Sequence, residues 1–429
     1  MPKRTTKRSP RTQIFAGSII CVVGALFYCY EFILRILPGI LQDELRVALG
    51  HISATAFGQI AALYYFAYAP MQLPVGILID RYGPRYLLTL ACLCCTIGSL
   101  MFSSHVLFIV STGRLLVGFG SAFAFVGVLS AAVNWLPKRY FSLVAGLMTT
   151  LGMLGLVYGE IQITQLAHQM GLHAALVSSI ILGVILTILL FVVVRDAPGK
   201  RVQQHQPFSV FFKQVLQVLR SKQVWIIAII GACLYTAISV FGELWGNTFL
   251  EHNYHLSKLQ AAQSMSMLFL GWAVGAPLMG YFSDRSGQRL LPLVLGATGS
   301  LVCICLILFN QTMSFHTLNL IVFLFGICSV SEIIVFIMAK EHSPSQELSG
   351  TIFAVVNMIV SFGGMIFQPM VGTLLDWSAV TISKQPIGTY STIDYQIALS
   401  VIPISMLLVL GLAFYLKLQT KAASTSKNS

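Results

Sequence analysis

The sequence contains little charge for its length. Only 9% of its 429 residues are Asp, Glu, Lys or Arg, and only 14 residues are acidic. Soluble domains are usually about one-quarter charged. Because 56% of the residues are hydrophobic, this composition excludes the ordinary soluble classes and places the chain in a lipid bilayer.

Motifs for several kinds of chemistry are also missing. The nine cysteines all lie inside apolar runs, which argues against a disulfide framework, and Cys92-Leu93-Cys94-Cys95 lacks the second ligand pair that a zinc site requires. No G-x-x-x-x-G-K-[ST] loop is present, so we expect that ATP does not drive the protein directly. We predict a protein that has no metal or cofactor and is not an enzyme.

Apolar runs long enough to cross the roughly 30 Å of a bilayer core occur twelve times. The first follows a basic segment, is longer than the apolar region of a signal peptide, and is therefore read as an uncleaved helix. The runs extend from 14 to the charged loop at 43 and over 56–79, 86–104, 106–130, 141–166, 173–194, 223–248, 259–283, 289–309, 316–339, 350–375 and 395–417. The predicted domains are a basic N-terminus at 1–13, six-helix bundles at 14–194 and 223–417, a linker at 195–222 and a tail at 418–429.

The basic residues are concentrated on one side of these predicted helices. With the N-terminus inside, only Arg46, Lys258 and Lys384 fall outside, and Arg35 and Arg114 lie within helices. Removing these five from the 26 basic residues leaves 21 on the inner side. Because basic residues stay in the cytoplasm, we expect both termini and the linker there, and we read the net charge of +12 as topology rather than as a nucleic-acid site. Within the linker, 208–216 is expected either to lie on the membrane surface as a short helix or to serve as a tether.

One motif occurs twice, 204 residues apart. Both 76–85 and 280–289 read G-x-x-x-D-R-x-G-x-R, a match expected by chance on the order of once per million start sites. The chain is therefore predicted to consist of two homologous halves in tandem. The repeated residues are Gly76, Asp80, Arg81, Gly83 and Arg85 in the first copy and Gly280, Asp284, Arg285, Gly287 and Arg289 in the second.

Together with the twelve runs and the repeated motif, the stretch R-L-L-V-G-F-G at 114–120 resembles the major facilitator superfamily of secondary transporters. The resemblance implies an all-α integral membrane fold in which two six-helix bundles, related by a pseudo-twofold axis, enclose a central cavity and alternate its access. It also implies that Arg114 is associated with the cavity and with proton coupling. The segment 69–76 is similar to that of bacterial nutrient-uptake members, so we expect the inner membrane of a bacterium.

Six ionisable residues fall within the predicted helices, where each costs at least about 2.5–3.5 kcal/mol to insert. They are Glu31, Arg35, Arg114, Glu160, Glu243 and Glu332. Glu31 and Arg35 lie four residues apart on one helical face, with Tyr28 one turn earlier, so this face should line the cavity. The alternative is that the two charges only neutralise each other, so that the helix can insert into the membrane. From its depth, Arg114 is predicted to pair with Glu31 across two helices.

Polar residues recur every three or four positions on two helices of the second half. The residues are Tyr235, Ser239, Glu243 and Asn247 on one helix and Asn357, Ser361, Gly364 and Gln368 on the other. We expect them to line the other wall of the cavity or to make packing hydrogen bonds. The cluster Tyr64, Tyr65, Phe66 and Tyr68, with Gln72, is either ordinary packing or an aromatic wall for the substrate. Glu160 ends a glycine-rich segment that indicates tight helix packing, and Glu332 is assigned to an inner gate.

A cavity that contains both a guanidinium and glutamates suits a substrate with a carboxylate and an amine. We predict a monomeric proton-coupled importer of amino acids, short peptides or carboxylates, in which Glu31 or Glu160 titrates. The alternatives are an organic-anion or siderophore carrier and a non-transporting receptor or scaffold, although the six buried charges speak against the last.

The repeated motif is predicted to act as a pair of latches on the cytoplasmic side. An aspartate favours the N-terminus of a helix, whose dipole attracts anions. Asp80 is therefore predicted to meet the helix that starts near Ser349 and Gly350, and Asp284 the one that starts near Ser142, when the protein faces outward.

Overall fold

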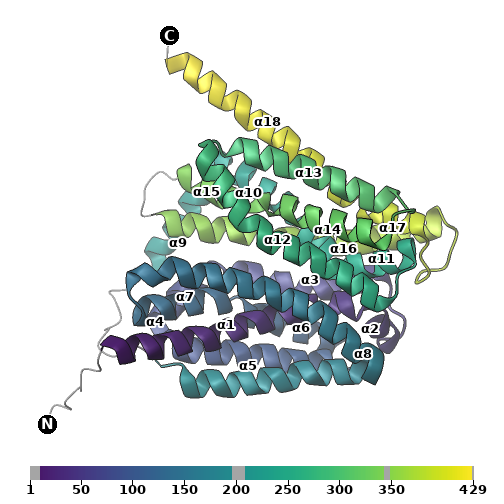
Figure 1. Ribbon diagram of the computed structural model, residues 1–429, viewed down its shortest axis with the longest axis horizontal. Helices are drawn as coiled ribbons and strands as arrows, with labels where there is room; N and C mark the ends of the chain where they lie inside the picture. The colour runs from purple at the N-terminus through teal and green to yellow at the C-terminus, as the bar shows by residue number, and fades with distance from the viewer. Residues whose placement is uncertain (1–9, 196–207, 343–347, 428–429) are drawn as a thin grey trace.

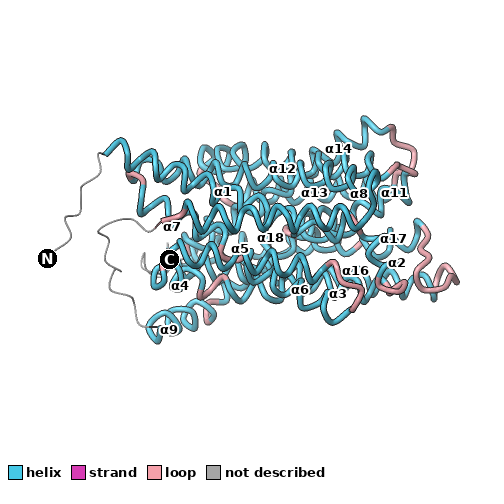
Figure 2. Tube along the Cα trace, turned by 90° about the horizontal axis from the view of Figure 1, so that it is seen from below, coloured by secondary structure: helices cyan, strands magenta, loops and turns pink. Residues whose placement is uncertain are grey.

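The computed structural model describes residues 10–195, 208–342 and 348–427, and every regular element within them is a helix (Figure 2). The first half comprises α1 (Pro10–Ile40), α2 (Gln42–Ala48), α3 (Ala54–Met71), α4 (Val75–Tyr82), α5 (Pro84–Phe102), α6 (Leu107–Ser121), α7 (Ala124–Trp135), η1 (Lys138–Tyr140) and α8 (Phe141–Val193). After the short linker helix α9 (Phe208–Leu219), the second half comprises α10 (Lys222–Leu234), η2 (Ala237–Trp245), α11 (Gly246–Tyr254), α12 (Lys258–Ser286), α13 (Leu290–Phe309), α14 (Phe315–Ser329), η3 (Val330–Glu332), α15 (Ile333–Glu341), α16 (Ser349–Thr381), α17 (Thr392–Leu399) and α18 (Val401–Lys427).

The number of membrane spans depends on how two bent segments are counted. Among the described residues, ten helical segments are long and apolar enough to cross a membrane, and the pair α3 and α4, bent by 63°, makes an eleventh. The longest of these segments lies within α8, which bends at Gly171 because that residue has a positive φ of 85° and non-helical geometry. Counting the two arms of α8 separately gives twelve spans, as the sequence predicts.

Two prolines explain the bend between α3 and α4. Pro74 has no N–H to donate to the carbonyl one turn earlier, and its ring clashes with a continuing helix. After Pro70 the hydrogen-bond spacing therefore shortens from four residues to three, and the N–H of Gln72 donates to the carbonyl of Ala69 at 3.1 Å. The helix restarts at Val75 and carries the first copy of the motif.

Positions 204 residues apart adopt the same conformations. Ser53 and Ser257 both cap the helix that follows them, with φ of −65° and −66°. Two glycines of the repeated motif, Gly83 and Gly287, both have a positive φ, of 82° and 61°, which an L side chain rarely adopts. This agreement supports the duplication that the motif indicated.

The helices form two bundles that lie side by side (Figure 1). In the first bundle α1 packs against α7 and α8, and α5 packs against α6 and α8. In the second bundle α12 packs against α14, and α13 packs against α14 and α18. The bundles meet along two long contacts, between α3 and α16 and between α8 and α12.

The two ends of the molecule differ in how closely the halves approach. We call the end with residues 76–85 and 280–289 the motif end, and the opposite end, with Arg46, Asp376 and Tyr390, the closed end. A Cβ on Gly39 or on Gly372 would come within 2.3 Å of a carbonyl oxygen of the other half. At the motif end, a Cβ on Gly76 or Gly350 would meet no atom of the described residues within 4 Å. The described chain begins and ends at the motif end (Figure 1).

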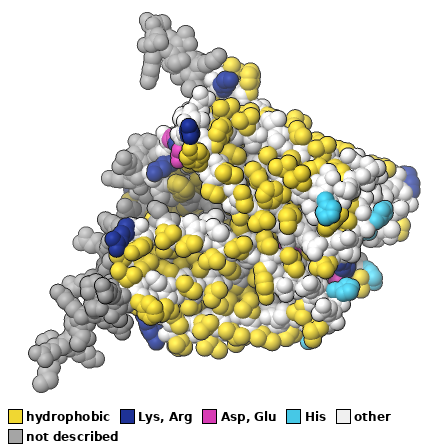
Figure 3. Space-filling view, viewed as in Figure 1, with side chains coloured by type: hydrophobic (Ala, Val, Ile, Leu, Met, Phe, Trp, Pro, Cys, Tyr) yellow, Lys and Arg dark blue, Asp and Glu magenta, His cyan; other side chains and the backbone are white. Residues whose placement is uncertain are grey.

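The outer surface is a broad apolar band. Hydrophobic side chains cover the middle of the face in Figure 3, and more of the Lys and Arg side chains on this face lie toward the motif end than toward the closed end. Large apolar side chains such as Phe108 and Phe414 are 79% and 62% exposed. Such a band matches the hydrocarbon core of a bilayer, because in lipid an exposed apolar side chain costs nothing.

Candidate functional site

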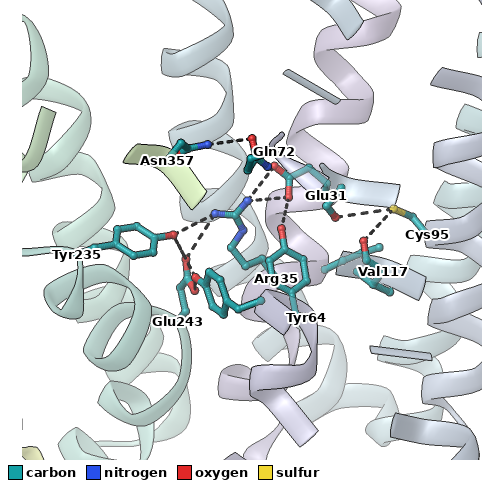
Figure 4. A network of polar contacts seen from close by, with 12 residues as sticks. Glu31, Arg35, Tyr64, Gln72, Cys95, Val117, Tyr235, Glu243 and Asn357 are labelled. Carbon is teal, nitrogen blue, oxygen red and sulfur yellow. Dashed lines mark hydrogen bonds and ion pairs between the residues drawn. The ribbon is translucent and has the colours of Figure 1, made fainter. Parts of the chain in front are cut away.

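Arg35 is the centre of a buried polar network between the two halves (Figure 4). Its Nη2 donates to both carboxylate oxygens of Glu31, one helical turn earlier on α1, at 3.2 Å. Its Nη1 donates to the Tyr235 hydroxyl at 3.1 Å and lies 3.9 Å from Oε1 of Glu243. A single guanidinium thus bridges a carboxylate of its own helix and a carboxylate of the opposite half.

Tyrosine hydroxyls supply further donors to the two carboxylates. Tyr64 donates to Oε2 of Glu31 at 3.1 Å, and Tyr235 donates to Oε1 of Glu243 at 3.3 Å. Tyr65 donates to Oε2 of Glu243 and lies 3.1 Å from the Tyr235 hydroxyl. Because unpaired buried carboxylates are costly, these hydrogen bonds help to keep the cluster stable in a low-dielectric site.

Aromatic rings surround the guanidinium. The Cζ atom of Arg35 lies 4.5 Å from the centre of the Phe32 ring and 5.1 Å from the centres of the Tyr64 and Tyr68 rings. Such faces stabilise a cation beyond simple burial. The cluster at 64–68 therefore belongs to the site, with the exception of Phe66, whose side chain is 59% exposed.

The local helix geometry of the second half explains how Glu243 reaches Arg35. Glu243 lies in η2, a stretch with five-residue hydrogen-bond spacing, which is rare and often occurs at functional sites. The halves approach closely here because Gly39 of α1 has no Cβ, and a Cβ at this position would lie 2.3 Å from the Glu243 carbonyl oxygen. The sequence indicated one regular polar stripe on this helix, whereas the structure divides it between two sites, since Asn247 does not join the Arg35 network.

Other predicted site residues lie near the network but contact different partners. Asn357 donates to Oε1 of Gln72 at 2.9 Å, which joins α16 to the turn after α3. Gln368 donates to the carbonyl of Ser239 at 2.7 Å, within the second half. The ring of Tyr28 packs edge-on against Phe32, with centroids 4.8 Å apart.

Arg114 does not pair with Glu31, contrary to the sequence prediction. It donates to the backbone carbonyl of Leu34 at 2.9 Å and to that of Ala61 at 3.4 Å. Glu31 is already bound by Arg35 on its own helix, so the second guanidinium binds helix carbonyls instead. The small residue on the same helix does permit close approach, because a Cβ on Gly118 would lie 2.0 Å from the Tyr64 carbonyl.

Two more buried glutamates lie outside the Arg35 network. Glu160 of α8 accepts a hydrogen bond from Nδ2 of Asn247, across the two halves, at 3.0 Å. The glycines before it allow α8 to pack on α1, where a Cβ on Gly155 would come within 3.1 Å of Cys29. Glu332 is buried at the end of η3, close to the buried Ser331.

At the motif end, the second copy of the motif forms ion pairs within its own half. Arg289 donates to Asp284 and to Glu341 at 2.8 Å each, which raises the pKa of the guanidinium above its ordinary value. Arg285 donates to the Tyr281 hydroxyl at 2.7 Å. In the first copy, the guanidinium groups of Arg81 and Arg85 stack on Tyr82 and Tyr86.

The latches are predicted to hold the motif end closed, and this structure is open at that end, so they stay predictions. The side chain of Ser142, the expected partner region of Asp284, lies outside the part of the chain that the structure describes.

At the closed end, the structure reveals a contact between the halves that the sequence did not indicate. Asp376 of α16 accepts from the backbone N–H of Ala54 at 3.2 Å and from the N–H and hydroxyl of Thr55 at 2.8 and 2.6 Å. Tyr390 donates to Asp376 at 2.6 Å and accepts from Arg46 at 3.1 Å. Burial and the bond to Asp376 raise the pKa of the Tyr390 phenol to about 12, so it remains a donor at neutral pH.

Further pairs close the same end. Thr248 donates to Oε1 of Gln42 at 2.8 Å, and Lys258 forms an ion pair with Glu44. Within the described ranges, no group of three or more His, Cys, Asp or Glu side chains is placed to hold a metal ion.

Comparisons with known proteins agree with this architecture. A family profile described as Major Facilitator Superfamily matches residues 14–368. The lysosomal dipeptide transporter MFSD1 of Danio rerio is 23% identical over 385 residues, which cover 83% of this chain and 79% of that protein. The uncharacterized transporter YybO of Bacillus subtilis is 22% identical over 446 residues, which cover 97% of this chain and 96% of that protein.

A solved structure has the same fold. It is the crystal structure of a bacterial homolog to the human lysosomal transporter Spinster, in an inward-facing and occupied conformation. The TM-score is 0.75 at 14% sequence identity, with coverage of 94% of this chain and 97% of that chain. The chain therefore belongs to the Major Facilitator Superfamily and is a multi-pass membrane transporter rather than an enzyme.

Proposed function

We propose that this protein imports small zwitterions with a free carboxylate and a free ammonium, such as dipeptides or amino acids, together with protons. The observation that carries the proposal is the position of Arg35 between Glu31 of one half and Glu243 of the other. A guanidinium binds a carboxylate in a bidentate manner, and a glutamate binds an ammonium. The site therefore contains a partner for each end of a zwitterion.

The longer of the two ion pairs, between Arg35 and Glu243, is the one that we expect the substrate to replace when it binds. Glu31 accepts from Arg35 at 3.2 Å on both oxygens, whereas Glu243 lies at 3.9 Å. A substrate carboxylate can replace Glu243 on Arg35, and the released Glu243 can then bind the substrate ammonium. Because the two groups belong to different halves, one substrate would join both halves and keep every buried charge paired.

One of the named relatives supports this substrate class. MFSD1 of Danio rerio is a dipeptide transporter by name, and the alignment with it covers most of this chain. An organic anion or a siderophore without an ammonium would leave Glu243 unpaired in the occupied site, so the glutamates favour the zwitterion over those alternatives.

The distribution of charge supports an orientation with the motif end in the cytoplasm of a bacterium. Helix ends and turns at the motif end carry Arg85, Arg139, Arg220 and Arg289, among others, whereas the closed end carries Arg46, Lys258 and Lys384. Cytoplasmic loops are enriched in Lys and Arg. In that orientation the present conformation faces inward, both termini are cytoplasmic, and we propose a monomer in the inner membrane.

Thermal unfolding of the purified protein with candidate solutes tests the substrate class. A ligand at 100 times its Kd stabilises the bound state by about 2.7 kcal/mol. We expect dipeptides to raise the melting temperature, and the same dipeptides with an acetylated N-terminus or an amidated C-terminus to raise it much less. Equal stabilisation by the blocked forms would contradict the proposal.

Two variants connect the ligand to the site. Glu243→Gln keeps a hydrogen-bonding group but removes the charge that the ammonium requires, so stabilisation by dipeptides should be lost. Glu332→Gln removes a buried carboxylate of the same half that lies outside the Arg35 network, so stabilisation should persist. Uptake into proteoliposomes with and without an inward proton gradient then tests the coupling and the direction.

A further inference from the structure

Glu160 and Asn247 form an isolated polar pair across the two halves, away from the Arg35 network. Glu160 is 0% exposed on α8, and Asn247 is 6% exposed on α11. Nδ2 of Asn247 donates to Oε2 of Glu160 at 3.0 Å. Beside this pair the same two halves touch again, where the Ser266 hydroxyl lies 3.4 Å from the Val157 carbonyl.

The remaining oxygen of each group has no hydrogen-bond partner. Oε1 of Glu160 and Oδ1 of Asn247 are both buried without a donor within the described part of the chain. Both atoms are acceptors if the carboxyl is ionised, and two unpaired buried acceptors are costly. A single proton on Oε1 of Glu160 removes the cost, because the resulting hydroxyl can donate to Oδ1 of Asn247.

We propose that Glu160 is a proton-binding site whose occupancy holds the closed end shut. The neutral acid and the amide form a cyclic pair in which Asn247 donates to Oε2 of Glu160 and the acid hydroxyl donates to Oδ1 of Asn247. The ligand is a proton taken up while the closed end is open, and closing that end buries it. Loss of the proton leaves a buried anion with one donor, which favours separation of the halves. This inference rests on the transport cycle proposed above and assigns the proton a place in it.

The charged groups on the helices around Glu160 contact partners other than Glu160. Four elements, α1, η2, α11 and α12, surround the pair. Along them, the acidic, basic and histidine residues nearest to the level of the pair are Glu31, Arg35, Glu243, Glu251, His252 and Lys258. Glu31 and Glu243 bind Arg35, and Lys258 pairs with Glu44. His252 stacks on Tyr395, with centroids 5.3 Å apart, and Glu251 lies one turn beyond Asn247, near Asp43 and Lys258. In α8 itself, His168 is exposed and two turns farther along the helix. None of these described contacts brings a cation to Glu160.

The test measures how far the halves separate at the closed end as the pH changes. Val47 of α2 and Ile387 after α16 are each 56% exposed and belong to different halves. In a variant that lacks the nine native cysteines, V47C and I387C carry spin labels, and the full-length protein is reconstituted in nanodiscs. In the otherwise unaltered protein, the ratio of separated to closed populations should rise with pH, by up to tenfold per pH unit above the titration midpoint.

Variants at the pair and beside it separate the proton from ordinary packing. In Glu160→Gln the amide side chain reproduces both hydrogen bonds without a titrating proton, so the distance should stay short at every pH. In Glu160→Ala the proton site is removed and not replaced, so the separated population should be larger and also independent of pH. Thr248→Val is the matched control, because it removes a neighbouring hydrogen bond between the halves without a proton. It should favour separation but keep the pH response.

The proposal is overturned if the unaltered protein shows no pH response, or if both Glu160 variants retain it. Dipeptide-induced thermal stabilisation of the same samples is measured in parallel. Loss of that stabilisation in the unaltered protein would count against the proposed function, whereas a missing pH response alone would count against the role of Glu160.

Discussion

Asp376 of one half caps the first turn of the helix that contains Thr55 in the other half. Its Oδ2 accepts from the backbone N–H and from the hydroxyl of Thr55, at 2.8 and 2.6 Å. The first N–H groups of a helix have no intrahelical acceptor, and the helix dipole adds a partial positive charge there. A carboxylate on the end of α16 therefore binds the start of α3 as a side-chain cap normally would, except that it comes from the opposite half.

The same two helices are predicted to make a second contact of this kind at the motif end, in another conformation. Asp80 follows α3, in α4, and the predicted partner of Asp80 is the start of α16 near Ser349. Asp376 of α16 would then contact the start of α3 at one end of the molecule, and Asp80 of α4, which continues α3, would contact the start of α16 at the other. The contact at Asp376 is made in the present conformation, and we expect the contact at Asp80 to replace it when the closed end opens.

Replacing Asp376 by Asn should weaken the closed end. One oxygen of the carboxylate becomes an NH2 group that faces N–H and O–H donors, and a buried donor left without an acceptor costs about 1–3 kcal/mol. The population with a separated closed end should therefore rise about fivefold to thirtyfold for a change of one or two kcal/mol. The distance between spin labels at positions 47 and 387 measures it. Asp394→Asn is the control, because Asp394 accepts from Ser378 and Ser391 within its own half.

Replacing Arg35 by Gln should destabilise the protein as well as stop transport. The change leaves Glu31 and Glu243 buried without their cation, and breaking a buried ion pair costs about 3–5 kcal/mol. The double variant Arg35→Gln and Glu31→Gln removes a charge of each sign, so it should recover much of the lost stability without recovering transport. Thermal unfolding in detergent measures both effects, and a double variant less stable than the single one would show that the charges are not coupled.

Replacing Arg114 by Lys should reduce stability but preserve binding of the dipeptide. The guanidinium reaches carbonyls on two helices, at Leu34 and at Ala61, which one ammonium on a flexible stem cannot do in the same geometry. Hydrogen bonds that involve a charged group contribute about 1.5–3 kcal/mol each. Dipeptide affinity, measured by calorimetry, should change little. A large loss of affinity at unchanged stability would instead assign Arg114 to the substrate.

Contacts within one helix could be predicted from the sequence, whereas contacts that depend on the packing of several helices could not. Glu31 and Arg35 share a helical face by their spacing, and the structure pairs them. The partners of Arg114 depend on how three helices are rotated against one another, which no spacing within one helix specifies. The division of the stripe at Glu243 and Asn247 follows from η2, and five-residue spacing has no clear mark in the sequence.

The closed end escaped prediction for a different reason. Asp376 lies near a helix end, where a charge is inexpensive because it can reach water or a loop, so its presence in the sequence carries no signal. Ionisable residues attract attention only at membrane depth, where burial makes them costly. Two of the donors to Asp376, the N–H groups of Ala54 and Thr55, belong to the backbone, which every sequence contains. Only the approach of α3 to α16 brings them together.

Two glycine substitutions should separate a packing role from a gating role. In Gly118→Ala the added Cβ would lie 2.0 Å from the Tyr64 carbonyl, so α6 and α3 must move apart. Inserting a methyl group into a packed contact costs about 1–3 kcal/mol, and the melting temperature should fall. In Gly76→Ala the Cβ meets no atom of the described part of the chain within 4 Å in this conformation, and alanine favours a helix over glycine by up to about 1 kcal/mol. The melting temperature should therefore stay the same or rise.

Transport should nevertheless fail in Gly76→Ala if the motif end must close during the cycle. The methyl group that is harmless in open space would then stand in the contact between the halves, and the protein would remain open at the motif end. We expect dipeptide binding to persist and the rate of uptake into proteoliposomes to drop, the opposite of the pattern for a folding defect. Normal uptake by Gly76→Ala would mean that the motif end closes without close contact at this residue, and that the gating role belongs to Asp80 and the arginines alone.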